Sequence, residues 1–106
     1  MPIRTRFPAA ALAAASLLAG APALAQEDVQ GRYLAATCAN CHGTDGRSAG
    51  GGGMPGLAGL SRTYMIEQMK AFRDGERKAT IMHQLAKGYT DEQIALMADF
   101  FSKQKK

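Results

Sequence analysis

The feature that most constrains this chain is the five-residue segment Cys38-Ala39-Asn40-Cys41-His42. Two cysteines separated by two residues and followed at once by a histidine form the attachment signature of a c-type haem. The two thiols add to the haem vinyl groups as thioethers, and the adjacent imidazole coordinates the iron from one face. The sequence therefore predicts one covalently attached haem c, bound through Cys38 and Cys41, with His42 as the proximal iron ligand.

Other sites also use two cysteines at this spacing. A thioredoxin-like redox motif is expected beside a βαβ unit, but no strand-like run precedes Cys38. A zinc site needs two more soft ligands, yet the chain has no further cysteine and just one further histidine, His83. Two bare thiols in an oxidising compartment would form a disulfide, which leaves the adjacent histidine unexplained. Haem attachment accounts for all three side chains.

Residues 1–25 have the organisation of a secretory signal peptide. A charged stretch with two arginines precedes a short apolar stretch, Ala9 to Ala19, and Ala23-Leu24-Ala25 is an A-x-A-type cleavage site. We therefore expect residues 1–25 to be removed and residues 26–106 to form a mature domain without a membrane span; an uncleaved anchor is the alternative. Because covalent c-haem attachment takes place outside the cytoplasmic membrane, the expected compartment in a bacterium is the periplasm.

Length and charge limit what this domain can do. A chain of this size buries so little apolar surface that a metal, a disulfide or a cofactor is often needed for stability. The haem-free chain is therefore expected to be largely unfolded. The formal net charge of +4 includes the two arginines of the signal, and no stripe of Lys and Arg with interleaved aromatic residues is present. Nucleic-acid binding is not expected.

The mature chain is predicted to begin with a helix from Glu27 to about Cys41. Its acidic residues lie in the first turn, where anions are favoured. Val29, Tyr33 and Ala36 recur at helical spacing, which predicts that they form the buried face. Gly31 lowers helix propensity, and is either a point of close approach for another helix or a tolerated surface glycine.

Three further helices are predicted, and no segment of the mature chain alternates as a strand does. Helix ends are indicated by Ser and Thr caps and by glycines. Met65, Met69 and Phe72 stand at i, i+4 and i+7, a spacing typical of core positions. The fold class is therefore all-α with about four helices, the later three being Arg62–Arg73 after Ser61, Thr80–Lys87 before Gly88, and Asp91–Lys103 after a Thr90/Gln93 capping box.

A long glycine-rich loop, Gly43 to Leu60, connects the attachment segment to the second helix. It carries no nucleotide-binding fingerprint. Pro55 fixes the backbone direction, and its carbonyl is free to accept a hydrogen bond. A metal-bound histidine usually donates its second ring N–H to such an acceptor. Pro55 is therefore the candidate support for His42, unless it is only a turn residue of the loop.

The second axial ligand is less determined by the residues themselves. A thioether stabilises ferrous iron and raises the reduction potential, whereas a second histidine lowers it. From position in the chain, Met82 is favoured, because it follows His42 at a distance that allows return over the opposite face. His83 and an open iron site remain alternatives at this point. The other methionine candidates in the mature chain are Met54, Met65, Met69 and Met97.

Taken together, these residues resemble a class I c-type cytochrome over nearly all of the mature chain. The resemblance rests on Cys38–His42, on Met54–Leu60, and on Thr80–Gln84. The continuation Leu85–Ile94 resembles more narrowly the cytochrome subunit of flavocytochrome c sulfide dehydrogenase and its relative cytochrome c4. The resemblance implies four helices wrapped around one haem. The two-haem members of these families have two attachment motifs, whereas this chain has one.

The same resemblance implies roles for individual residues. The methionine that matches Met82 is the distal ligand, and Pro55 supports His42. The first and last helices cross, with a small residue such as Gly31 at the contact. The electron donor that the resemblance implies is an FAD-containing sulfide dehydrogenase subunit. The chain itself has no flavin motif.

The leading hypothesis is thus a periplasmic mono-haem electron carrier that is not itself an enzyme and has no catalytic residues. A freely diffusing carrier of the cytochrome c4/c5 kind, serving a terminal oxidase or another redox enzyme, is the alternative in the same class. A haem-based sensor or a peroxidase-like enzyme with an open iron site is the alternative from another class. The latter would bind carbon monoxide rapidly in the ferrous form.

Overall fold

The computed structural model describes residues 1–3, 22–50 and 53–106. The predicted apolar stretch Ala9 to Ala19 lies outside these residues. No β-strand occurs in the described part of the chain, so the all-α prediction is confirmed. The elements in order are α1 (Pro22–Ala35), the 3₁₀ turn η1 (Ala36–Cys38), α2 (Ala39–His42), the 3₁₀ turn η2 (Thr44–Gly46), α3 (Arg62–Asp74), α4 (Met82–Ala86) and α5 (Asp91–Ser102).

The first predicted helix, Glu27 to Cys41, differs from the structure at both ends. The helix α1 already begins at Pro22, a residue type that suits the first turn because it has no N–H to leave unpaired. It ends at Ala35, where η1 tightens the backbone before α2 continues to His42. The attachment segment is therefore a short helical turn of its own rather than the last turn of one long helix.

The prediction of which face of α1 is buried was wrong. Val29 and Tyr33 are 66% and 81% exposed, and Ala36 is exposed as well. The buried positions are Gly31 and Ala35. The smallest residues of the helix face its partner because they allow the two backbones to approach closely, which larger side chains at i and i+4 would prevent.

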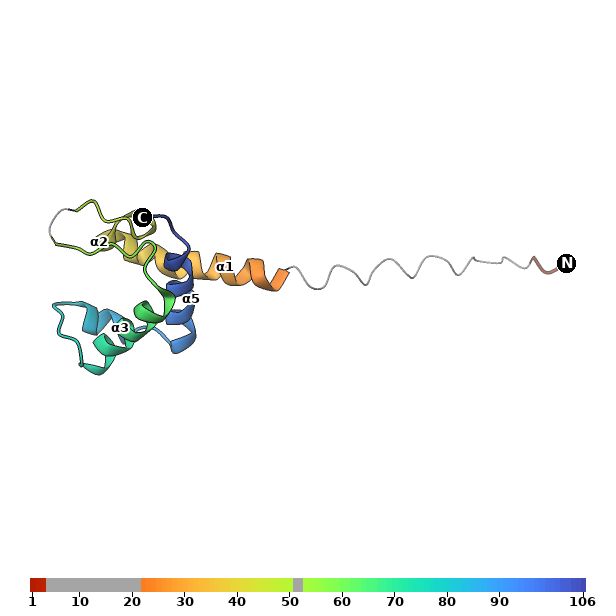
Figure 1. The fold of residues 1–106 in the computed structure, drawn as a ribbon. Helices are drawn as coiled ribbons and strands as arrows, with labels where there is room; N and C mark the ends of the chain where they lie inside the picture. Colours follow the sequence, from red (N-terminus) through yellow and green to blue (C-terminus); the bar gives the residue numbers. More distant parts are fainter. Residues whose placement is uncertain (4–21, 51–52) are drawn as a thin grey trace.

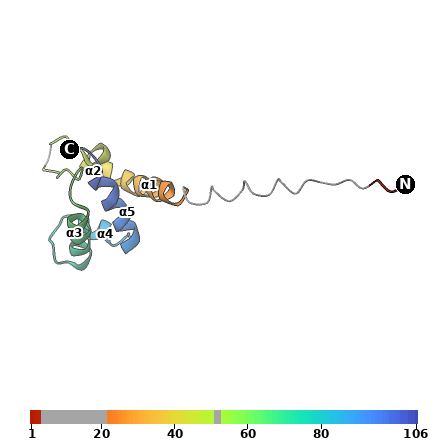
Figure 2. The ribbon, with the colours of Figure 1, turned by 45° about the vertical axis from the view of Figure 1, so that its right-hand side comes forward.

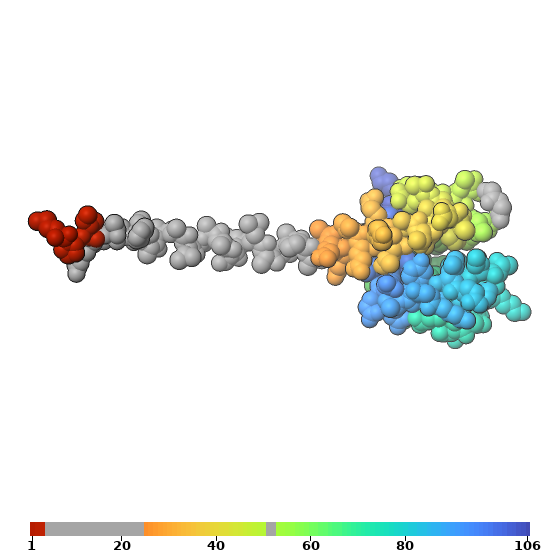
Figure 3. Space-filling model, turned by 180° about the vertical axis from the view of Figure 1, so that it is seen from behind, coloured from red at the N-terminus to blue at the C-terminus, as the bar shows by residue number. Residues whose placement is uncertain are grey.

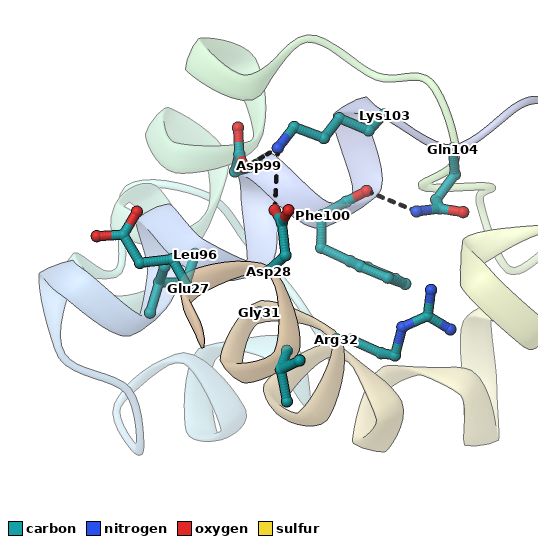
Figure 4. Close-up of a pocket in the computed structure, with 10 residues that line it drawn as sticks. Glu27, Asp28, Gly31, Arg32, Leu96, Asp99, Phe100, Lys103 and Gln104 are labelled. Carbon is teal, nitrogen blue, oxygen red and sulfur yellow. Dashed lines mark hydrogen bonds and ion pairs between the residues drawn. The ribbon is translucent and has the colours of Figure 1, made fainter. Parts of the chain in front are cut away.

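That partner is α5, which crosses α1 in both ribbon views (Figures 1 and 2). A Cβ added to Gly31 would lie 2.8 Å from the carbonyl oxygen of Leu96, so the expected close contact at Gly31 is confirmed. Figure 4 shows the same crossing, where Lys103 Nζ bridges Asp28 at 3.2 Å and Asp99 at 2.7 Å. These side chains border a small cavity of about 320 Å³ beside the crossing.

The helices α3 and α5 begin where their caps predict. Ser61 Oγ accepts a hydrogen bond from the Tyr64 amide, and Gly75 ends α3 in the left-handed conformation. Both bonds of the Thr90/Gln93 capping box are present at the start of α5. The helix α4 is shorter than the predicted Thr80–Lys87, because Ile81 has non-helical backbone angles, with φ of −139°, and the helix starts only at Met82.

The core lies where α5 packs between α1 and α3 (Figure 2), and α4 packs against α3. Buried side chains from three elements and the intervening loop form one cluster. The loop residue Leu57 packs against this cluster. The buried members are Ala35, Met65, Ala98 and Phe101.

The haem cavity

A cavity of about 530 Å³ opens between two halves of the domain. One half consists of η1, α2 and the following loop, and the other of α3, α4 and the turns around them. Most of the lining is apolar or aromatic, and the inner wall is formed by the buried Ile94, Met97 and Phe101 of α5. A flat, largely apolar group fits such a cavity.

Both cysteines of the attachment segment line this cavity, although they differ in exposure. Cys38 is half-buried and Cys41 is exposed, and neither forms a disulfide. Burial raises the pKa of the Cys38 thiol. The turn of η1 and α2 places both sulfurs at one border of the cavity, as attachment to one planar group requires.

His42 is buried at 9% exposure and also lines the cavity. Its Nδ1 lies 2.7 Å from the carbonyl oxygen of Pro55. Because a carbonyl can only accept, the proton resides on Nδ1, and Nε2 carries the free lone pair. A histidine held in this way is ready to bind a metal through Nε2.

The loop that presents Pro55 is closed by a left-handed glycine. Gly46, with φ of 78°, accepts hydrogen bonds through its carbonyl from the amides of Leu57 and Ala58, at 2.8 and 3.1 Å. A Cβ at this position would lie 2.8 Å from the Phe101 ring and 2.9 Å from the Ala58 nitrogen. The start of the loop is therefore fastened to its end, which brings Pro55 back beneath His42.

The structure brings all five methionine candidates to the cavity. Met82 lies at the first position of α4 and is half-buried. Met65 and Met97 are buried at 7% and 4% exposure and are packed in the core. Cavity lining alone therefore does not distinguish the five, which are Met54, Met65, Met69, Met82 and Met97.

His83 does not line the cavity, in contrast to its neighbour Met82. Its Nδ1 is buried and has no hydrogen-bond partner among the described residues. Adjacent residues on a helix point about 100° apart, and here Met82 is the one on the cavity side. This arrangement disfavours His83 as an iron ligand.

Two cations that the sequence did not indicate as site residues, Arg77 and Lys78, lie at the edge of the cavity. Arg77 is held over the Phe72 ring at 4.6 Å and donates to Gln68 Oε1 at 2.7 Å. None of the described residues that line the cavity is acidic. In the sequence, Arg77 and Lys78 are recognisable only as a basic pair just after the end of a helix, and such a pair by itself indicates an exposed turn.

These features fit haem c better than the alternatives. The cavity combines two thiols, an oriented imidazole and a thioether with an apolar lining, and its two cations complement the two propionates of a haem. Within the described ranges, no cluster of three His, Cys, Asp or Glu is placed to hold a metal ion. The zinc alternative therefore lacks ligands there.

A small helical domain with a C-x-x-C-H turn beside an apolar cavity defines a haem-attachment domain. A family model described as Cytochrome c matches residues 26–105. The chain belongs to the cytochrome c family of electron-transfer proteins, whose cofactor is covalently attached haem c. This agrees with the prediction of one haem c and of a carrier rather than an enzyme.

Three relatives show the range of similar proteins. The cytochrome subunit of sulfide dehydrogenase from Chlorobaculum tepidum is 42% identical over 72 residues, covering 68% of this chain and 64% of that protein. Cytochrome c-554(548) from Halomonas halodenitrificans is 45% identical over 71 residues, covering 64% of this chain and 84% of that protein. Cytochrome c4 from Pseudomonas aeruginosa is 35% identical over 88 residues, covering 83% of this chain and 43% of that protein.

These matches confirm the resemblance to the sulfide dehydrogenase cytochrome subunit and to cytochrome c4. The chain spans less than two thirds of the Chlorobaculum protein and less than half of the Pseudomonas protein. In the described part of the chain, no helix is long and apolar enough to cross a membrane.

Proposed function

We propose that this chain is an exported electron carrier with one haem c, attached through Cys38 and Cys41, in which His42 and Met82 are the axial ligands and Pro55 orients His42. One observation carries the proposal. The cavity that receives the attachment segment is also bordered by an imidazole with its Nδ1 already engaged and by the thioether of Met82.

Each of these groups has a defined task in electron transfer. When bound, the haem supplies an iron that gains and loses one electron. His42 presents a neutral Nε2, and its hydrogen bond to Pro55 holds the ring orientation and increases its basicity. The thioether of Met82 favours the ferrous state and raises the reduction potential. If His42 and Met82 both bind the iron, no coordination position would be left for a substrate.

Among the methionines, Met82 is proposed on position and packing together. Met54 precedes Pro55 on the loop that approaches His42 from its own side. Met65 and Met97 are packed in the core, and Met69 lies within the long helix α3. Met82 begins a short helix that is not part of the core cluster, and it occupies the position that the family resemblance implies for the ligand.

The proposed electron donor is an FAD-containing subunit of a sulfide dehydrogenase, and the proposed compartment is the periplasm. The similarity to the cytochrome subunit of the Chlorobaculum sulfide dehydrogenase supports the donor. The signal-like pattern of residues 1–25, with cleavage after Ala25, supports export.

A freely diffusing carrier is the second candidate. It is favoured by the Halomonas cytochrome, of which this chain covers 84%, since the matched segment makes up most of that protein. The two candidates differ in whether a stable complex with a flavoprotein forms, not in the haem site.

The deciding experiment is gentle purification of the protein from the native periplasm, followed by reduced and oxidised spectra. A flavin on a larger co-purifying subunit, with haem reduction driven by sulfide, is the expected result for the first candidate. Haem c on a small free chain would overturn the complex and support the diffusing carrier. Rapid carbon monoxide binding by the ferrous protein at neutral pH would contradict axial ligation by Met82 and favour a sensor or a peroxidase-like enzyme.

A further inference from the structure

One hydrogen bond crosses the opening of the haem cavity. Thr37 Oγ1 and the Tyr89 hydroxyl lie 3.0 Å apart although 52 positions separate them in the chain, and both residues line the cavity. Among the described residues, no other hydrogen bond or ion pair joins residues 22–50 and 53–60 to residues 61–90. The two halves of the cavity are thus tied together by polar contact at this point.

The direction of this bond follows from its surroundings. The Thr37 hydroxyl lies 3.1 Å from the carbonyl oxygen of Leu34 and donates to it. It therefore accepts from Tyr89, whose O–H is the donor in the contact that crosses the cavity. Thr37 directly precedes Cys38, so the acceptor belongs to the segment that holds the haem.

The donor belongs to the opposite half. Tyr89 lies in the turn between α4 and α5, and its amide bonds to the carbonyl of Ala86 at 3.4 Å. The next residue, Thr90, is the N-cap of α5. This turn is therefore well defined, and it is only a few residues from Met82. In Figure 3, the yellow segment around residue 35 and the blue segment around residue 85 meet on one face of the molecule.

We infer that Tyr89 and Thr37 form a clasp that holds the Met82 segment against the attachment segment, so that the Met82 side of the cavity opens rarely. The inference rests on the proposed ligation by Met82. Its physical basis is that α4 packs chiefly on α3, so that little else fixes its distance from the Cys38 segment. Tyr89 is thus a positioning residue that acts through Met82.

The test is the rate at which imidazole replaces Met82 in the ferric holoprotein, followed by loss of the methionine-to-iron charge-transfer band. At low imidazole concentration this rate is proportional to the population of the open form. Removal of a net stabilising hydrogen bond is expected to raise that population, and so the rate, about threefold to tenfold. The variants Tyr89→Phe and Thr37→Val each remove one hydroxyl and keep the shape of the side chain.

Two control variants distinguish the loss of the Tyr89–Thr37 hydrogen bond from a nonspecific destabilisation of the cavity. Tyr64→Phe removes the hydroxyl of another tyrosine that lines the cavity and makes no side-chain hydrogen bond among the described residues. It should keep the wild-type rate. Thr37→Ser retains the acceptor and should also keep it. The double variant Tyr89→Phe/Thr37→Val should be no faster than either single variant, because the two hydroxyls act as one contact.

The outcomes separate failure of the clasp from failure of the proposed ligation. A wild-type protein without the charge-transfer band would overturn ligation by Met82, and the clasp with it. A wild-type band combined with unchanged rates in Tyr89→Phe and Thr37→Val would overturn the clasp alone. Multiplicative acceleration in the double variant, or equal acceleration by Tyr64→Phe, would overturn it too.

Discussion

The imidazole Nδ1 of His42 donates a hydrogen bond to the carbonyl oxygen of Pro55 over 2.7 Å, across 13 positions of the chain. The loop between the two residues is closed by the bonds from Leu57 and Ala58 to the Gly46 carbonyl. The proximal histidine is therefore oriented by a backbone group that proline holds in place.

This relationship predicts the effect of Pro55→Gly on the reduction potential. Glycine keeps the carbonyl but lets it sample more positions, so the hydrogen bond weakens and His42 becomes a less basic ligand. The potential should rise by about 20 to 60 mV, at most about a tenfold change in a one-electron equilibrium. Redox titration of the holoprotein measures it, with Pro55→Ala expected to shift less. Equal potentials in all three proteins would refute the orienting role.

The choice of Met82 as distal ligand predicts a contrast between two alanine variants. Met82→Ala should lose the methionine-to-iron charge-transfer band, show a lower reduction potential and bind carbon monoxide readily when reduced, because the soft thioether is removed. Met69→Ala also removes a thioether from the cavity lining and should retain the band. A retained band in Met82→Ala, or its loss in Met69→Ala, would show that the ligand has been misassigned.

Removal of a cation from the edge of the cavity is expected to lower the reduction potential, in contrast to the rise expected for Pro55→Gly. Arg77→Gln removes a positive charge beside the expected haem propionates, which favours the ferric state. The potential should fall by about 20 to 40 mV, the equivalent of roughly 0.5 to 1 kcal/mol for a partly exposed charge pair. Lys87→Gln, which removes an exposed lysine that does not line the cavity, is the control and should leave the potential within error. An equal fall in both variants would mean that only net charge matters.

The helix crossing predicts a loss of stability in Gly31→Ala. The added Cβ would lie 2.8 Å from the Leu96 carbonyl oxygen, so α1 and α5 must separate. The free energy of unfolding of the holoprotein should fall by about 1 to 3 kcal/mol in a guanidinium titration, despite the better helix propensity of alanine. Gly56→Ala, whose nearest contact would be 3.5 Å away, should change it by less than about 0.5 kcal/mol. A stabilised Gly31→Ala protein would contradict the close crossing.

The ion pairs at the start of α5 predict a response to acid. The hydrogen bond from Arg73, together with the charges of Lys70 and Arg73, lowers the pKa of Asp91 below its ordinary value of 3.8. The stabilisation is therefore complete above about pH 5 and is lost as the pH falls through the lowered folded-state pKa. Asp91→Asn should flatten the acid side of a stability-against-pH curve. Glu92→Gln, also in the first turn of α5, should leave the slope unchanged, and a steeper slope in Asp91→Asn would contradict the pairing.

Much of the fold was predictable because it depends on short-range rules. The start of α3 at Arg62 after Ser61 and the start of α5 after Thr90 follow from caps that act within one turn. Ile94, Met97, Ala98 and Phe101 repeat at helical spacing, and all four are buried. In each case the residues that carry the signal are neighbours along the chain.

The predictions for the first helix failed where its structure depends on the helix that packs against it. Val29 and Tyr33 have the spacing of a buried face, but α5 selects the face of α1 that has the smallest side chains, Gly31 and Ala35. Likewise, the 3₁₀ turn Ala36–Cys38 interrupts the predicted helix at the first cysteine of the attachment segment. Which face of a helix is buried depends on the element that packs against it, and that element lies far away in the sequence.

The sequence by itself determined the chemistry of this protein. The two thiols and the imidazole of Cys38–His42 are adjacent in the chain, so their spacing was enough to identify covalent haem attachment. Only the tertiary structure decided what surrounds that group: the carbonyl of Pro55 at Nδ1 of His42, the cations Arg77 and Lys78 at the cavity edge, and the Tyr89 hydroxyl on Thr37. These contacts join residues far apart in the chain, and their distances are set by the packing of α5 between the two halves rather than by local sequence.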